Sequence, residues 1–187
     1  MTTPAIIIGI LFVLCLTSPA ATRSVGLVGE GDKPAQKFLV PLVFGISQGL
    51  AAFIGHTIGR LIAHLYTYIA EYIVFAMMIV VAVKLFVDSM RMLRGKMLYT
   101  VNTEMEMITL SILAAMNTLL MSLMGPYFMP FDYGFILVVA AAGFLWSFLI
   151  VRKEFTPAMI KKLSFVEFSA AVFMVVIAVL YLFTDLI

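Results

Sequence analysis

Six apolar stretches, each close to the length that crosses a bilayer as a helix, make up most of this chain. They lie at residues 5–22, 38–58, 68–86, 107–125, 133–151 and 163–183, and charged residues, Gly or Pro separate them. A helix that crosses the hydrocarbon core needs about 20 predominantly apolar residues. The pattern therefore predicts an all-α polytopic membrane protein, with six transmembrane helices in a single membrane domain, 1–187.

The composition excludes several classes of protein. The chain is 64% hydrophobic and 12% charged, whereas a soluble domain carries about 25% charged residues. A net charge of +2 gives no basic surface for nucleic acid. The chain has one cysteine, Cys15, so it forms no intramolecular disulfide. It also lacks the HExxH and phosphate-loop motifs. We therefore expect no enzyme and no cofactor, and we expect the lipid bilayer as the main partner.

The basic residues are distributed unevenly between the two sides of the predicted helices. Eleven of the twelve fall at or in the first, third and fifth connections: Arg23, Lys33, Lys37, Lys84, Arg91, Arg94, Lys96, Arg152, Lys153, Lys161 and Lys162. Arg60 alone falls on the other side. Cytoplasmic loops carry an excess of Lys and Arg. The bias predicts a protein of the inner membrane, with these connections in the cytoplasm and both termini on the periplasmic side.

The number of helices also constrains the architecture. Because each half has three helices, related halves must have opposite orientations in the membrane, as in inverted repeats. We expect repeat one at about 1–90 and repeat two at about 105–187. The first helix carries the polar pair Thr17-Ser18 and the fourth carries Asn117-Thr118. These four side chains are candidates for a substrate-binding site near the midplane of the membrane, and we expect the first helix to bend at Pro19.

Residues 44–59, FGISQGLAAFIGHTIG, resemble the second helix of the manganese efflux pumps in the lysine-exporter (LysE) superfamily. Residues 84–91, KLFVDSMR, resemble the end of that family's third helix, with Asp88 at an acidic position. The resemblance implies a small six-helix carrier built from inverted repeats, with Mn²⁺ as a transported ion. Gln48 matches a position of the family motif, whereas a family proline is replaced by Ala52.

The chain departs from the family where the family has an Asp-Ala pair in the first and the fourth helix. Pro19-Ala20 stands at the first place, and Asn117 or Thr118 at the second. Mn²⁺ prefers carboxylate, carbonyl and water oxygens as ligands. The resemblance therefore implies the fold of a manganese exporter with a site that lacks both carboxylates, and leaves Gln48 and Asn117 as the metal-ligand candidates.

Gln48 and the hydroxyl side chains each have a structural alternative. Gln48 is either a ligand in the pathway or an interhelical hydrogen bond, worth about 0.6 kcal/mol in such settings. Ser and Thr hydroxyls in helices often bond to carbonyls of their own helix. The candidate substrate site consists of Thr17, Ser18, Gln48, Asn117 and Thr118.

The charged residues within the apolar stretches are predicted to be peripheral. Lys84 and Asp88 are four residues apart and are expected to pair across one helical turn near the cytoplasmic face. Arg23 is expected to mark the cytoplasmic boundary of the first helix; the alternative is that it faces the pathway. Glu167 is expected to complement the dipole at the start of the sixth helix.

These observations predict a secondary transporter, an exporter that resembles manganese efflux pumps and works by alternating access. One alternative is a non-transporting membrane subunit or scaffold on the same fold, which the missing carboxylates suggest. Another is an exporter of a small organic solute. A homodimer or another protein partner is compatible with each of these.

Overall fold

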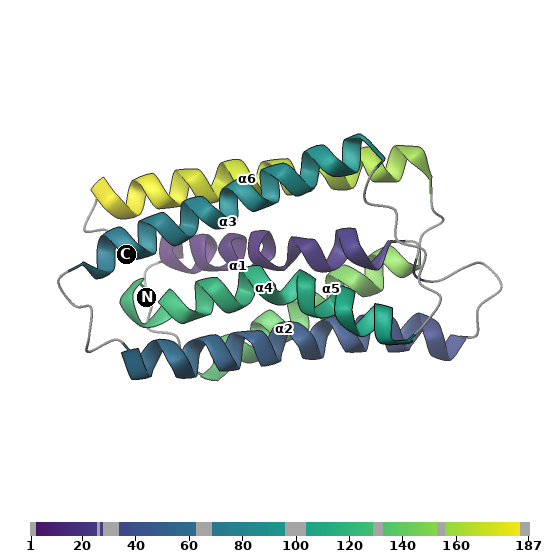
Figure 1. Ribbon diagram of the computed structural model, residues 1–187, viewed down its shortest axis with the longest axis horizontal. Helices are drawn as coiled ribbons and strands as arrows, with labels where there is room; N and C mark the ends of the chain where they lie inside the picture. Colours follow the sequence, from purple (N-terminus) through teal and green to yellow (C-terminus); the bar gives the residue numbers. More distant parts are fainter. Residues whose placement is uncertain are drawn as a thin grey trace.

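The computed structural model describes residues 3–25, 27, 34–62, 69–95, 104–128, 133–152 and 156–183. Within them the chain forms six α-helices, which run side by side along one direction (Figure 1). Their bounds are α1 Thr3–Ser24, α2 Pro34–Ile62, α3 Ala70–Leu93, α4 Glu104–Phe128, α5 Tyr133–Val151 and α6 Pro157–Phe183. The number of helices predicted from the apolar stretches is confirmed.

Most helices extend beyond the apolar stretch that predicted them. Five of them, α2 to α6, contain segments that are long and apolar enough to cross a bilayer, while α1 contributes the shorter apolar segment Gly9–Ser24. A helix satisfies its own backbone donors and acceptors, which hydrocarbon cannot do. Many large apolar side chains point outward, as expected for a lipid-facing surface.

The bundle consists of two groups of helices with α1 between them. In one group α2 packs against both α4 and α5, and in the other α3 packs against α6. Helix α1 contacts α4, α5 and α6, and α3 also contacts α4, so that both sets of contacts join the two groups (Figure 1). Helix α1 starts and α6 ends at the same end of the bundle, and α1, α3 and α5 end at the opposite end.

Glycines let α2 approach both of its neighbours closely. A methyl group added at Gly55 would lie 2.5 Å from the Leu119 carbonyl oxygen of α4. One added at Gly45 would lie 2.9 Å from Phe144 Cβ of α5. Both separations are far below ordinary contact, so only glycine fits. Small residues at four-residue spacing allow such approach in membranes, where packing rather than water drives helix association.

Helix α1 continues through Pro19 to Ser24. Proline has no N–H group, so the carbonyl of Cys15, one turn earlier, loses its usual partner. The Ser18 hydroxyl donates to that carbonyl at 2.8 Å and replaces the missing bond. A serine beside the proline therefore lets α1 remain helical inside the membrane, where an unpaired carbonyl would be costly.

The close approach at Gly55 predicts a measurable loss of stability on adding a single methyl group. Gly55→Ala would push the α2 backbone away from Leu119, and overpacking of this kind costs about 1–3 kcal/mol. Thermal unfolding of the purified protein in detergent measures the effect. Gly134→Ala is the matched control, because nothing lies within 4 Å of a methyl group there. Equal unfolding midpoints for the two variants would contradict the packing account.

Candidate functional site

Gln48 lies at the interface between α2 and α4 and is fully buried. Its amide nitrogen donates to the Ala114 carbonyl of α4 at 3.3 Å, and its amide oxygen accepts from the Thr118 hydroxyl. Gly143 of α5 makes room for it, since a methyl group there would lie 2.7 Å from Gln48 Cγ. Gln48 is therefore held by three helices, and it connects α2 to α4 by hydrogen bonds.

A second polar contact continues this interface. The hydroxyls of Ser47 on α2 and Ser111 on α4 lie 2.8 Å apart. We call the residues Ser47, Gln48, Ser111, Asn117 and Thr118 the polar seam. The structure thus brings together Gln48 and Thr118, two of the five predicted site residues, by a hydrogen bond between α2 and α4, and Asn117 is the neighbour of Thr118 along α4.

Asn117 differs from the other members of the polar seam. Its side chain is fully buried, and neither its amide oxygen nor its amide nitrogen has a hydrogen-bond partner among the described residues. It lies on one helical stripe with Leu110, Ala114 and Met121, which pack in clusters that include residues of α1. Asn117 therefore lies at the α1–α4 interface. Its amide oxygen can still accept a hydrogen bond, and its amide nitrogen can still donate two.

Thr17 and Ser18, the two remaining predicted site residues, are fully buried on α1. Their hydroxyl hydrogens are already used within the helix: Thr17 donates to the Val13 carbonyl at 2.8 Å and Ser18 to that of Cys15. Only the lone pairs of their oxygens remain available. Their role in binding a substrate stays a prediction.

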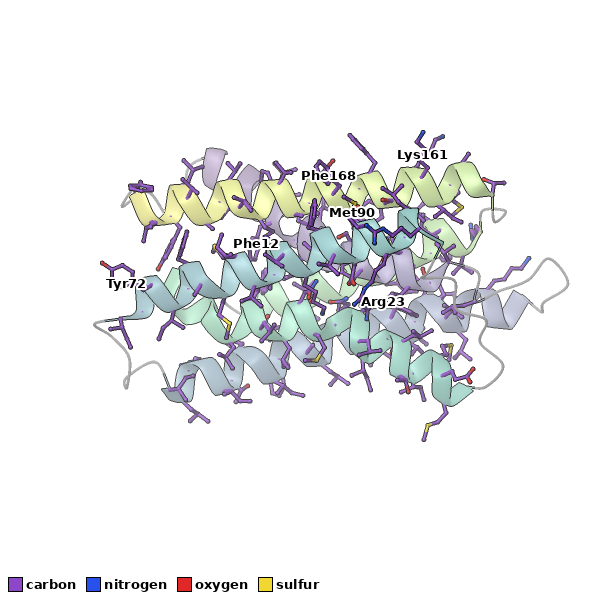
Figure 2. The ribbon with its side chains drawn as sticks, turned by 45° about the horizontal axis from the view of Figure 1, so that its top comes forward. Phe12, Arg23, Tyr72, Met90, Lys161 and Phe168 are labelled. Carbon is purple, nitrogen blue, oxygen red and sulfur yellow. The ribbon has the colours of Figure 1, made fainter. Side chains whose placement is uncertain are left out.

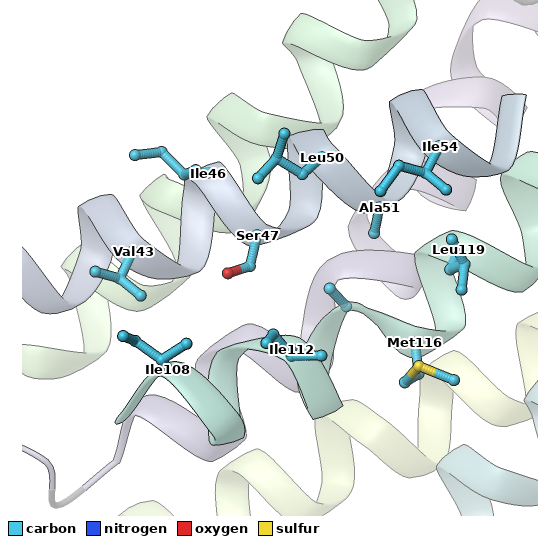
Figure 3. A pocket seen from close by; sticks show the side chains of 11 residues that line it. Val43, Ile46, Ser47, Leu50, Ala51, Ile54, Ile108, Ile112, Met116 and Leu119 are labelled. Atoms are coloured by element: carbon cyan, nitrogen blue, oxygen red, sulfur yellow. The ribbon is translucent and has the colours of Figure 1, made fainter. Parts of the chain in front are cut away.

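A groove of about 500 Å³ lies between α2 and α4, and its walls are apolar apart from Ser47 (Figure 3). Ile46, Leu50 and Ile112, which line it, are each about half exposed on the outer surface of the bundle. The groove therefore opens toward lipid and suits hydrocarbon, not an ion. Ser47 of the polar seam lines this groove, whereas the other four members of the seam are fully buried.

A separate group of charged side chains lies where α1, α3 and α6 meet. We call Thr22, Arg23, Lys84, Asp88 and Glu167 the charged cluster. Arg23 Nη2 lies 3.2 Å from Asp88 Oδ2, and both side chains are less than one-tenth exposed. Thr22 Oγ1 lies 2.6 Å from Glu167 Oε1. Figure 2 shows Arg23 inside the bundle, whereas Lys161 projects from its surface.

The charged cluster corrects three of our predictions. Asp88 forms its ion pair with Arg23, not with Lys84 one turn away. Arg23 does lie in the last turn of α1, as expected of a boundary residue, but its side chain is only 7% exposed and is paired inside the bundle. Glu167 is 1% exposed and lies well beyond the first turn of α6, which begins at Pro157, so it does not complement the helix dipole. The physical reason is common to all three: a charge inside the membrane finds a buried partner on another helix.

Among the described residues no group of three or more His, Cys, Asp and Glu side chains is arranged to hold a metal ion. The polar seam offers amide and hydroxyl oxygens only. A hard cation such as Mn²⁺ accepts such oxygen ligands, together with water and carbonyls. A site of this kind would bind a divalent ion less tightly than one with carboxylates.

Comparison with known families identifies the chain. Residues 32–152, which span α2 to α5, match the profile of the family described as Putative manganese efflux pump. The chain belongs to this family. Comparisons with curated proteins and with solved structures gave no significant match. The matched segment contains Gln48, Lys84, Asp88, Asn117 and Thr118, whereas Thr22, Arg23 and Glu167 lie outside it.

The long apolar helices and the family together identify a multi-pass membrane protein. The manganese efflux pumps are a family of transporters, not of enzymes. Sequence reasoning found the family and Gln48, but it missed the charged cluster. One signal in the sequence could have found it, because Arg and acidic residues lie within the apolar stretches. Ionisable residues inside a membrane are rare and are therefore candidates for functional residues.

The buried Arg23–Asp88 pair predicts non-additive effects on stability. Arg23→Leu or Asp88→Leu alone leaves an unpaired charge in the bundle, and such losses cost about 3–5 kcal/mol. The double variant removes both charges, so it should lose less stability than the sum of the two single variants. Thermal unfolding in detergent of the four proteins measures this cycle. Additive losses would show that the two side chains do not stabilise each other.

Proposed function

We propose that this protein is a secondary transporter that exports Mn²⁺ by alternating access, with the cargo held at the polar seam. The observation that carries the proposal is Asn117, whose amide is fully buried and unpartnered among the described residues. An unsatisfied buried amide costs about 1–3 kcal/mol of stability. That cost is understandable where a ligand supplies the missing partner during the transport cycle.

The pattern of helix contacts supports an architecture of two inverted repeats. In two repeats of three helices, α1 is equivalent to α4, α2 to α5 and α3 to α6. The contact between α2 and α4 then has the contact between α5 and α1 as its equivalent, and the contact between α1 and α6 has that between α4 and α3. The pairs α1–α4, α2–α5 and α3–α6 map onto themselves, and each is in contact. Helices α1 and α4 run in opposite directions (Figure 1). Inverted repeats place the substrate site where the halves meet, and Asn117 lies at the α1–α4 contact.

The position of the basic residues supports the proposed orientation in the inner membrane. Arg91, Arg94, Arg152, Lys161 and Lys162 are exposed, and they lie at or near the ends of α3, α5 and α6 that face the odd-numbered connections. By the positive-inside rule this end of the bundle is cytoplasmic, and both termini are periplasmic. Export then carries the cargo toward the end of the bundle at which α1 begins.

The uncharged seam has a consequence for the transport cycle. A carrier must bind its cargo well enough to load it and weakly enough to release it. Amide and hydroxyl oxygens offer partial charges only, so we propose that Mn²⁺ keeps part of its water shell at the seam. Low affinity suits an exporter that works only when the cytoplasmic concentration of the ion rises.

Asn117→Leu separates a transport role from a structural one. Because Asn117 forms no hydrogen bond with described residues, leucine of similar size should leave the unfolding temperature unchanged or raise it. The same variant should abolish Mn²⁺ flux into proteoliposomes loaded with a fluorescent indicator. Thr109→Val is the control on the same helix, since Thr109 is exposed and its hydroxyl donates to the Met105 carbonyl of the same helix. Normal flux in Asn117→Leu would exclude Asn117 from the site.

Asn117→Asp distinguishes a cation from a neutral cargo. A carboxylate at this position adds a charged oxygen ligand that a hard cation prefers. If Mn²⁺ is the cargo, the concentration for half-maximal flux should fall, and the maximal rate should fall with it because release becomes slower. The flux assay with varied Mn²⁺ measures both. A native protein that is folded and inserted but moves no divalent ion would instead favour a non-transporting subunit or a carrier of organic solutes.

A further inference from the structure

Glu167 is the most deeply buried carboxylate among the residues whose exposure the structure describes. It lies ten residues after Pro157, where α6 begins, which places it about 15 Å along the helix at 1.5 Å per residue. Its side chain is 1% exposed. A carboxylate at such a depth is costly unless it is paired or protonated. Its surroundings therefore show how its charge is accommodated.

The hydrogen bonds around Thr22 are compatible with two protonation states of Glu167. Thr22 Oγ1 lies 2.6 Å from Glu167 Oε1 and 3.2 Å from the Pro19 carbonyl oxygen. A hydroxyl has one hydrogen to donate and two lone pairs to accept with. Thr22 can therefore donate to an ionised Glu167, or it can accept from a protonated Glu167 while it donates to Pro19. The same arrangement of heavy atoms satisfies both protonation states.

Three charged groups face Glu167 from the neighbouring helices: Arg23 of α1, and Lys84 and Asp88 of α3. Arg23 Nη2 is bound to Asp88, while Arg23 Nη1 has no partner among the described residues. Glu167 Oε2 likewise has no partner there. When Glu167 is ionised, the two positive and two negative charges of these four side chains sum to zero. The two atoms without a partner, Arg23 Nη1 and Glu167 Oε2, then belong to groups of opposite charge.

From this geometry we propose that Glu167 is the proton-binding site that couples cargo export to a proton gradient. The inference rests on the proposed function as a transporter. In the loading step Glu167 takes a proton from water on the periplasmic side, and the O–H group that forms donates its hydrogen bond to Thr22 Oγ1. Release returns the proton to water on the cytoplasmic side and leaves a carboxylate. Arg23 then bridges Asp88 and Glu167 through its two terminal nitrogens, and this draws α1, α3 and α6 together.

The coupling follows from that change of contacts. Helix α1 joins the two helix groups of the bundle, and it carries both Thr22 and Arg23. Protonation removes the negative charge that attracts Arg23 Nη1, so α1 becomes free to move relative to α6. Because α1 also contacts α4, where Asn117 lies, the protonation of Glu167 can change access to the polar seam. Inward movement of protons would thus be linked to outward movement of Mn²⁺.

A first experiment tests proton binding without any cargo. Infrared difference spectra of the purified native protein in lipid, recorded over a pH series, should contain the carbonyl stretch of a protonated carboxyl group. Glu167→Gln should lack that band. Thr22→Val should keep the band at a shifted frequency, because the hydrogen bond is lost. Glu106→Gln, which alters an exposed carboxylate of α4, is the control and should match the native spectrum. A band unchanged in Glu167→Gln would overturn the assignment.

A second experiment tests coupling in proteoliposomes. Glu167→Gln mimics the permanently protonated state, so it should lose Mn²⁺ accumulation driven by a pH gradient, down to the level of protein-free vesicles. It should retain the exchange of Mn²⁺ for Mn²⁺ across the membrane, which needs no net proton movement. Gradient-driven accumulation equal to that of the native protein would overturn the inference. If the native protein itself moves no Mn²⁺, the proposed function fails, and the infrared series alone decides whether Glu167 binds a proton.

Discussion

Hydrocarbon offers no hydrogen-bond partner, and this constraint explains the arrangement of nearly every polar group in the bundle. Each helix satisfies its own backbone, and where Pro19 interrupts the pattern in α1, the Ser18 hydroxyl replaces the missing donor. Ser89 and Ser164 satisfy each other across α3 and α6, with each hydroxyl within 3.0 Å of the other residue's carbonyl oxygen. Against this background, an unpartnered buried polar atom is an exception that calls for a functional explanation.

Ser122 Oγ and Trp146 Nε1 are also buried without a partner among the described residues, but the two exceptions that concern our proposals are Asn117 and Glu167. Asn117 lies between α1 and α4, in the polar seam, and Glu167 lies between α1, α3 and α6, in the charged cluster. Helix α1 contacts both regions, whereas glycines hold α2 firmly against α4 and α5. Close packing at these glycines therefore holds together the helices α2 and α4, which carry the polar seam, whereas in our proposal the polar contacts of the central helix α1 change with the protonation of Glu167.

Much of the fold could be predicted from the sequence, because hydrophobicity along the chain reports the membrane directly. The six helices, the close packing of the α2 glycines and the burial of Gln48 all follow from local patterns. The partner of Asp88 could not be predicted in the same way. Local spacing favours Lys84, four residues away, whereas the observed partner, Arg23, is 65 positions distant. Only the tertiary arrangement of α1 and α3 brings these two side chains together.

The central claim is that amide and hydroxyl oxygens hold a divalent cargo without a carboxylate. Electron paramagnetic resonance of Mn²⁺ titrated into the purified native protein tests it most directly, because bound ions lose the signal of the free hydrated ion. The account predicts saturable loss of free signal with the native protein and none with Asn117→Leu. Equal binding by the two proteins, or no binding by the native protein at concentrations that saturate flux, would contradict the claim.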